Sequence, residues 1–142
     1  MKWLKLCART KKNKTFLYKF TSKTKRNIMA NIMGLTDLLK GEIVSCHGDD
    51  LLYLFNAHSL PMDIEMNSKD FQHIERITKL WTNFAKYGNP TPDGSLGVTW
   101  EPYTVENQNY LEIGNKLIAG TSPDEEELQF WENTLQEFGL QM

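Results

Sequence analysis

The stretch from residue 68 to residue 92 constrains the fold most, because it contains a long helix whose two ends are both marked in the sequence. Its apolar residues recur every three or four positions, the period of one face of an α-helix: Phe71, Ile74, Ile77, Leu80, Trp81 and Phe84. Ser68 is a residue type that caps helix starts, and Gly88 suits the left-handed position after a helix end. Prolines at positions 90 and 92 prevent continuation. We therefore expect a helix over about 68–86.

The same helical pattern predicts which side chains of this segment point inward. The apolar face places Trp81 and Phe84 in the core, whereas Lys79 and Lys86 should point to water. His73 carries no recognisable motif, and we interpret it as a solvated helix position.

Short apolar runs predict the strands. Phe16–Phe20 has the aromatic composition of a strand. Further along, Tyr110–Ile113 and Lys116–Ala119 flank Gly114-Asn115, a dipeptide that tolerates the positive φ angles of a two-residue hairpin turn. We expect these two runs to pair antiparallel.

Two further helices are predicted from acidic residues or a serine at the position where each helix would begin. Asp49 and Asp50 precede an apolar run, and acids stabilise the positive end of a helix dipole. We therefore expect a helix over about 49–55 and interpret both carboxylates as helix-start residues, not as a paired acid/base site. Ser122 should cap a last helix that has Pro123 at its first position. The inner face of that helix would consist of Leu128, Trp131, Leu135 and Phe138.

Charge is unevenly distributed along the 142 residues. Residues 1–36 contain ten of the sixteen Lys and Arg residues and no acid, because the first carboxylate is Asp37. Residues 1–14 show neither a helical nor a strand period, so we expect a disordered basic head there. The remainder, 15–142, has the length and the apolar content of one domain.

Cysteine content and hydrophobic runs exclude several classes of protein. Cys7 and Cys46 are too few for a disulfide framework and do not form a CxxC pair. The opening stretch lacks the continuous apolar core of a signal peptide, and no run reaches the roughly 18 apolar residues that a transmembrane helix needs. We therefore expect a soluble chain and favour a cytoplasmic location.

Three stretches together resemble the type-B carboxylesterase and cholinesterase family of α/β-hydrolases. The first is Cys-His-Gly-Asp-Asp-Leu-Leu-Tyr-Leu-Phe at 46–55. The second is Leu-Trp-Thr-Asn-Phe-Ala-Lys-Tyr-Gly-Asn-Pro-Thr-Pro at 80–92, which leads to Trp100 and Pro102. The third is Tyr-Leu-Glu-Ile-Gly at 110–114 with Phe130-Trp131. Their order and spacing are similar to the family over roughly residues 15–138, and the nearest likeness is to insect detoxifying esterases.

The resemblance implies an α/β fold, namely the C-terminal fragment of an α/β-hydrolase with few strands, a C-terminal β-hairpin and much helix. In this family a serine on a Gly-x-Ser-x-Gly turn attacks an ester carbonyl, a histidine takes the serine proton, and a carboxylate orients the histidine. His47 matches the histidine position, on a loop after the strand at 16–20. The implied substrates of the complete parent are small carboxylic esters, with no metal and no organic cofactor. The implied partner of this chain is the N-terminal part of the hydrolase.

The sequence departs from the family in its nucleophile. It contains no Gly-x-Ser-x-Gly, and the nearest string, Asp93–Gly97, lacks the first glycine and lies in a Pro/Gly-rich loop. Upstream of His47 the only acids are Asp37 and Glu42, which are too close to it to be the family's acid. The Gly-rich oxyanion loop is missing as well. We therefore expect the chain alone to be inactive and His47 to be exposed.

Other interpretations stay open from the sequence. A thiol dyad of Cys46 with His47 is disfavoured because adjacent side chains rarely face one another. Metal binding by His47, His58, Asp49 and Asp50 fits no standard ligand spacing. One alternative function is a non-catalytic interaction module derived from an esterase. Another is weak binding of nucleic acid or anionic surfaces through the basic head at 1–14, although no specific nucleic acid is expected.

Overall fold

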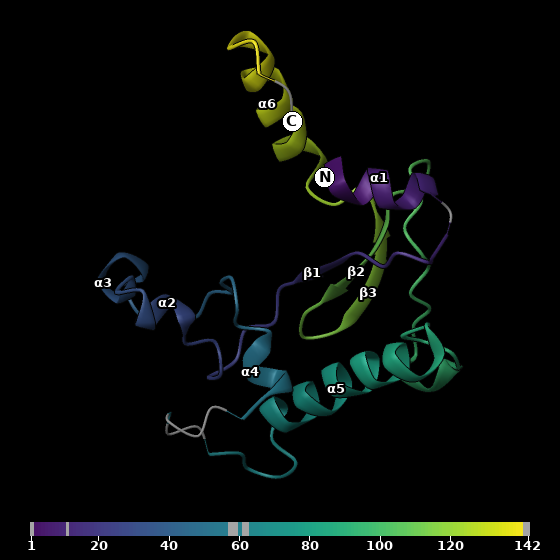
Figure 1. The fold of residues 1–142 in the computed structure, drawn as a ribbon. Coiled ribbons are helices and arrows are strands. Elements are labelled where there is room, and N and C mark those ends of the chain that lie inside the picture. The colour runs from purple at the N-terminus through teal and green to yellow at the C-terminus, as the bar shows by residue number, and fades with distance from the viewer. Residues whose placement is uncertain (1, 11, 57–59, 61–62, 141–142) are drawn as a thin grey trace. The chain divides into compact units, whose positions relative to one another are not determined.

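The computed structural model describes residues 2–10, 12–56, 60 and 63–140 (Figure 1). Its elements in chain order are α1 (Lys2–Thr10), β1 (Tyr18–Phe20), α2 (Met29–Ile32), α3 (Thr36–Leu39), α4 (Leu51–Leu54), α5 (Lys69–Tyr87), the 3-10 helix η1 (Gly94–Leu96), β2 (Asn109–Ile113), β3 (Leu117–Thr121) and α6 (Glu125–Glu137). The chain divides into two compact units. Unit 1 comprises residues 1–19, 100–111 and 119–142, and unit 2 comprises residues 20–99 and 112–118.

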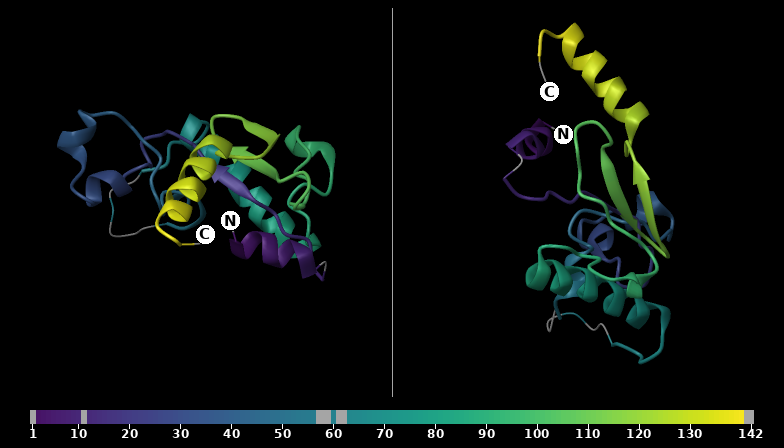
Figure 2. Two further views of the ribbon diagram at one scale, coloured as in Figure 1. Left: turned by 90° about the horizontal axis from the view of Figure 1, so that it is seen from above. Right: turned by 90° about the vertical axis from the view of Figure 1, so that its right-hand side faces the viewer.

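The three strands form one sheet with β2 in the middle. The Leu111 amide donates to the Leu17 carbonyl over 3.0 Å, and the Thr21 amide donates to the Ile113 carbonyl over 2.9 Å. Because later residues of β1 pair with later residues of β2, these two strands are parallel. β2 and β3 form the predicted antiparallel hairpin (Figure 2). The pairing of the hairpin is thus confirmed, and so is a strand in the region 16–20, although it covers only Tyr18–Phe20.

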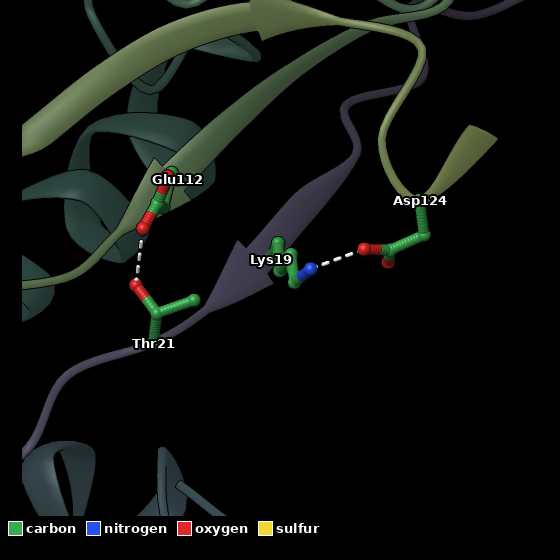
Figure 3. Close-up of polar contacts among 4 residues, drawn as sticks. All are labelled: Lys19, Thr21, Glu112 and Asp124. Atoms are coloured by element: carbon green, nitrogen blue, oxygen red, sulfur yellow. Dashed lines mark hydrogen bonds and ion pairs between the residues drawn. The ribbon is translucent and has the colours of Figure 1, made fainter. Parts of the chain in front are cut away.

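The turn of this hairpin differs from the prediction. β3 begins at Leu117, so that residues 114–116 connect the strands, and neither Gly114 nor Asn115 has a positive φ. The glycine is needed for a different reason. A Cβ at position 114 would lie 2.5 Å from the Thr21 hydroxyl oxygen, and that hydroxyl donates to the Glu112 carboxylate over 2.7 Å (Figure 3). The close approach of Thr21, the residue directly after β1, rather than turn geometry, favours glycine here.

Both predicted ends of the long helix are confirmed. α5 begins at Lys69, and the Ser68 hydroxyl accepts a hydrogen bond from the Phe71 amide over 3.1 Å. At the other end Gly88 adopts the left-handed conformation with φ 62°. These features depend on residues within one turn of the helix end, which is why the sequence alone predicts them.

The buried face of α5 differs from the predicted one. Its buried residues are His73, Ile77 and Leu80, whereas Trp81 is half-buried and Phe84 is 48% exposed. The burial of Phe84 and the solvation of His73 were wrong predictions. The reason is tertiary: α4 packs against α5 and covers the face that carries His73. Lys79 and Lys86 are exposed, as predicted.

Residues 2–10 form a helix, although the sequence pattern predicted no regular structure for 1–14. The segment consists mostly of Lys, Leu, Ala and Arg, which have high helix propensity, and this local preference explains the difference. Leu4 and Ala8 are half-buried along one side. The domain boundary at residue 15 stays a prediction.

The last helix begins later than predicted. α6 starts at Glu125, and its N-cap residue Asp124 has a left-handed φ of 55° without a side-chain cap bond. Ser122 does not cap the helix. The Asp124 carboxylate instead pairs with Lys19 (Figure 3), and this contact raises the pKa of the Lys19 ammonium. Of the predicted inner face, Leu128 and Leu135 are half-buried, but the more apolar positions 131 and 138 are 55% and 74% exposed.

Each unit buries its own apolar side chains. In unit 1 these are Trp100, Tyr103 and Leu111, and the Trp100 indole N–H donates to the Leu17 carbonyl over 3.0 Å. In unit 2 the buried apolar residues are Ala30, Leu52, Tyr53, Ile77, Leu80 and Ile113. Within the described ranges, no helix is both long enough and apolar enough to cross a membrane.

Candidate functional site

His47 is exposed and begins a turn, residues 47–50, that leads into α4. The predicted order of loop and short helix is confirmed, although α4 covers only Leu51–Leu54, not 49–55. Among the described residues, His47 makes no hydrogen bond and no ion pair. The expectation that the imidazole is accessible is therefore confirmed as well.

The turn itself contains a buried carboxylate. Asp49 is 0% exposed and accepts hydrogen bonds from the Cys46 amide at 2.7 Å and the Met29 amide at 3.0 Å. The Asn27 side-chain amide adds a longer bond of 3.3 Å. The interpretation of Asp49 as a helix-start acid was wrong, because the carboxylate bonds backwards to residues 27–46 and does not cap α4. Asp50 is the N-cap residue of α4, without a side-chain cap bond.

The contacts of Asp49 explain how the His47 turn is held. A buried carboxylate is tolerated only when its oxygens are hydrogen-bonded, and bonds to an ionised acceptor are stronger than neutral ones. Asp49 thereby joins the residue before His47 to the start of α2. Gly48 has a φ of 86°, a conformation that favours glycine. The backbone around His47 is thus held by the hydrogen bonds of Asp49, while the His47 side chain is exposed.

Around Asp49, buried polar side chains of unit 2 form a hydrogen-bonded network that motif analysis did not predict. The Tyr53 hydroxyl bonds to the Thr24 hydroxyl at 2.7 Å and donates to the Asn27 side-chain oxygen at 2.8 Å. The Asn27 amide donates to the Ser22 carbonyl at 2.7 Å. The Ser22 hydroxyl lies 2.6 Å from the His73 Nδ1. Such networks fix one arrangement of a core when every member is satisfied.

The Ser22–His73 pair has the spacing of a nucleophile and its base, but not the accessibility. Ser22 is 0% exposed, so an ester carbonyl cannot reach its oxygen. Burial lowers the pKa of His73, the nearby cations Arg76 and Lys69 lower it further, and Asp70 opposes the shift. The pair is therefore a structural contact between a neutral imidazole and a hydroxyl. The i, i+4, i+7 series of His73, Ile77 and Leu80 was the sequence signal that could have located this histidine in the core.

The remaining sequence candidates are exposed or lie outside the described residues. Ser95 lies in η1, and its hydroxyl and amide bind the exposed Asp93, so the Asp93–Gly97 string is not a strand–turn–helix elbow. Asp37 and Glu42 are exposed. His58 lies outside the described residues. Within the described part of the chain, no group of His, Cys, Asp and Glu residues is arranged to hold a metal ion.

Comparison with known proteins identifies the family. The model of the Carboxylesterase family matches residues 1–131. The chain belongs to the carboxylesterase family. This match includes the basic head at 1–14, whereas the resemblance of the sequence motifs begins at about residue 15.

The relatives of this carboxylesterase-family chain that are named here are much longer than it. Bile salt-activated lipase of Rattus norvegicus is 34% identical over 134 residues, which are 91% of this chain and 20% of the lipase. Pyrethroid hydrolase Ces2a of Mus musculus is 29% identical over 89 residues, 63% of this chain and 15% of that protein. The chain thus spans about a fifth of the length of the curated relatives it matches.

Solved structures agree on the fold. Juvenile hormone esterase from Manduca sexta aligns with a TM-score of 0.70 at 23% identity, over 93% of this chain and 25% of that structure. PNB esterase aligns with a TM-score of 0.56 over 80% of this chain. The fold is accordingly part of an α/β-hydrolase, as predicted. The narrower likeness to insect detoxifying esterases stays a prediction, because the curated relatives named above are mammalian.

Proposed function

We propose that this chain is the C-terminal part of a serine carboxylesterase, that His47 is its triad histidine, and that the chain alone does not hydrolyse esters. The observation that carries the proposal is the position of His47. This residue is exposed on a turn in which the Asp49 carboxylate accepts a hydrogen bond from the Cys46 amide. An exposed imidazole can accept a proton from a hydroxyl at one ring nitrogen and donate the N–H of the other to a carboxylate, provided that other residues supply both groups.

Family membership and partial length support the same proposal. The chain matches the carboxylesterase family and covers about a fifth of its relatives. Its sequence contains no Gly-x-Ser-x-Gly, and the serine nearest to a histidine in the described residues, Ser22, is inaccessible. In the complete enzyme, a serine oxygen would attack the ester carbonyl while His47 Nε2 takes its proton. The same proton would then pass to the leaving alcohol.

A first experiment tests inactivity. The purified 142-residue chain is incubated with p-nitrophenyl butyrate, and release of p-nitrophenolate is compared with that of a heat-denatured sample. We expect equal rates, because without a nucleophile the histidine has nothing to activate. Hydrolysis that is abolished by His47→Ala and blocked by an organophosphate would show that a serine of this chain is active.

A second experiment tests the role of His47. The transcript upstream of Met1 is searched for an in-frame Gly-x-Ser-x-Gly, and the extended protein is expressed. We expect ester hydrolysis, and a loss of about 10³-fold or more in kcat for His47→Gln. Circular dichroism of the variant serves as the control, since an exposed side chain without hydrogen bonds should be replaced without unfolding. An extended, active protein that is insensitive to His47→Gln would exclude His47 as the base.

A further inference from the structure

A hollow of about 400 Å³ opens in unit 2 beside the first turns of α5. It is distinct from the His47 turn and from the basic head at 1–14. Its walls include four cationic side chains, Lys23, Lys25, Lys69 and Arg76, together with one carboxylate, Asp70. We call it the α5 hollow. Its volume lies within the range of about 300–1,000 Å³ found for small-molecule sites.

The cations of the α5 hollow are not neutralised by partners in this part of the molecule. None of the four takes part in an ion pair among the residues that the structure describes, and Asp70 is the single carboxylate in the wall. Four like charges around one concave surface repel one another, and a bound anion relieves that repulsion. The unbalanced charge therefore favours an anionic ligand.

Arg76 is the best-fixed of these cations. Its Nη1 donates to the Asn115 carbonyl over 3.0 Å, which holds the guanidinium against the hairpin turn. A guanidinium has five N–H donors, so the others remain to bind oxygens of a ligand. The side chain is half-buried, which weakens the screening of its charge by water.

Two further features of the α5 hollow favour an anion, namely the His73 imidazole and the N-terminus of α5. His73 lines it, and its Nδ1 is occupied by Ser22. When Ser22 donates to Nδ1, the ring carries its proton on Nε2, which makes no hydrogen bond among the described residues. In addition, the 19-residue helix α5 begins at Lys69, so the positive end of its dipole lies at the same wall.

We propose that the α5 hollow binds a small phosphate-class oxyanion, such as inorganic phosphate, pyrophosphate or a phosphate monoester, through Lys25, Lys69 and Arg76. Tetrahedral oxyanions combine a high charge with several acceptor oxygens, which the cluster of ammonium, guanidinium and imidazole donors complements. The site is independent of ester hydrolysis and does not depend on the role of His47.

The test uses the complete 142-residue chain and follows its backbone amide resonances by NMR. Phosphate and pyrophosphate are titrated at constant ionic strength, with chloride as the balancing anion. We expect saturable shifts confined to residues 23–25, 69–76 and 115. The double variant Lys25→Gln/Lys69→Gln should weaken binding at least about fivefold. Both side chains are exposed and make no hydrogen bond among the described residues, so the fold should tolerate these changes.

The matched control is Lys79→Gln/Lys86→Gln, which removes the same charge from exposed positions of the same helix. We expect its affinity to change by less than about twofold. Arg76→Lys keeps the charge but loses the fork of donors, and binding should weaken here as well. Shifts that do not saturate, equal weakening by both double variants, or binding only to vesicles with phosphatidic acid would each overturn the proposal.

Discussion

Two buried tyrosines show how much a single hydroxyl can matter. Tyr53 is 2% exposed and its hydroxyl bonds to Thr24 and Asn27. Tyr103 is 3% exposed, but its hydroxyl has no hydrogen-bond partner among the described residues. Burial raises the pKa of both phenols. Because an unpaired buried polar group costs free energy whereas a paired one is stabilising, the same chemical change should have opposite consequences at the two positions.

The substitution Tyr53→Phe should lower the free energy of unfolding by about 1–2 kcal/mol, because it removes a member of the buried network. Tyr103→Phe should leave it within about 0.5 kcal/mol of the parent or raise it slightly, since the hydroxyl is already unpaired. Urea unfolding followed by circular dichroism measures both. Equal losses for the two variants would mean that the network around Tyr53 contributes nothing beyond packing.

His73 should make the stability depend on pH near neutrality. Its folded-state pKa lies below the unfolded value of about 6.5, chiefly because the ring is buried. The unfolded chain therefore binds more protons in this range, and stability rises with pH. The contribution is complete above about pH 6.5 and is lost as the pH falls below it.

Urea unfolding at pH 7.5 and 5.5 tests this titration. The parent chain should be less stable at pH 5.5, and His73→Gln should show a smaller difference between the two pH values. As a control, His47→Gln makes the same substitution at an exposed position. Asp93, whose pKa is lowered by its bonds to Ser95, titrates below this range and does not contribute. An unchanged pH dependence in His73→Gln would contradict the assignment.

At the scale of elements, the features that depend on neighbouring residues were predicted better from the sequence than the features that depend on tertiary packing. The ends of α5 depend on Ser68 and Gly88, which act within one turn, and both were predicted correctly. The buried face of the same helix depends on what covers it, and the sequence could not show that α4 would cover His73 rather than Phe84. The start of α6 was wrong for a similar reason, because its N-cap residue Asp124 pairs with Lys19, 105 positions away. The catalytic position of His47 was predicted from a family motif. The structural role of Asp49 could be recognised only from its hydrogen-bond partners in the structure.

The hairpin offers a test of the close approach between β1 and the turn. Gly114→Ala should lower the free energy of unfolding by about 1–3 kcal/mol, since its Cβ would displace the Thr21 hydroxyl from Glu112. Gly94→Ala is the matched control, because nothing lies within 4 Å of its Cβ position and its φ is not positive. We expect that variant to be within about 0.5 kcal/mol of the parent. Thermal unfolding compares the two, and equal effects would show that Thr21 moves away freely.

At the scale of the whole molecule, charge is unevenly distributed along the sequence, since residues 1–36 contain ten Lys and Arg residues and no acid. The basic first 36 residues contribute to α1, to β1 and to the wall of the α5 hollow. Their positive charges therefore belong to several different structural elements. The match to the carboxylesterase family begins at residue 1 and therefore includes the basic head.

Any binding of nucleic acid by the basic head should be weak and sensitive to salt. Simple phosphate attraction falls steeply with ionic strength because it depends on the release of counterions. Fluorescence anisotropy with a labelled DNA duplex should therefore detect binding at about 50 mM salt and almost none at about 200 mM. A salt-resistant, sequence-selective complex that disappears on deletion of residues 1–14 would establish the opposite.

The bonds of Asp49 also bear on the order in which the chain folds. Its partners Asn27, Met29 and Cys46 all lie within 22 positions of it. Closing so short a loop costs little chain entropy, and contacts of small sequence separation form quickly. The base of the His47 turn should consequently reach its native arrangement before the sheet, where β1 must find β2 some 90 residues away. On a ribosome, this region would be assembled while α6 is still inside the exit tunnel.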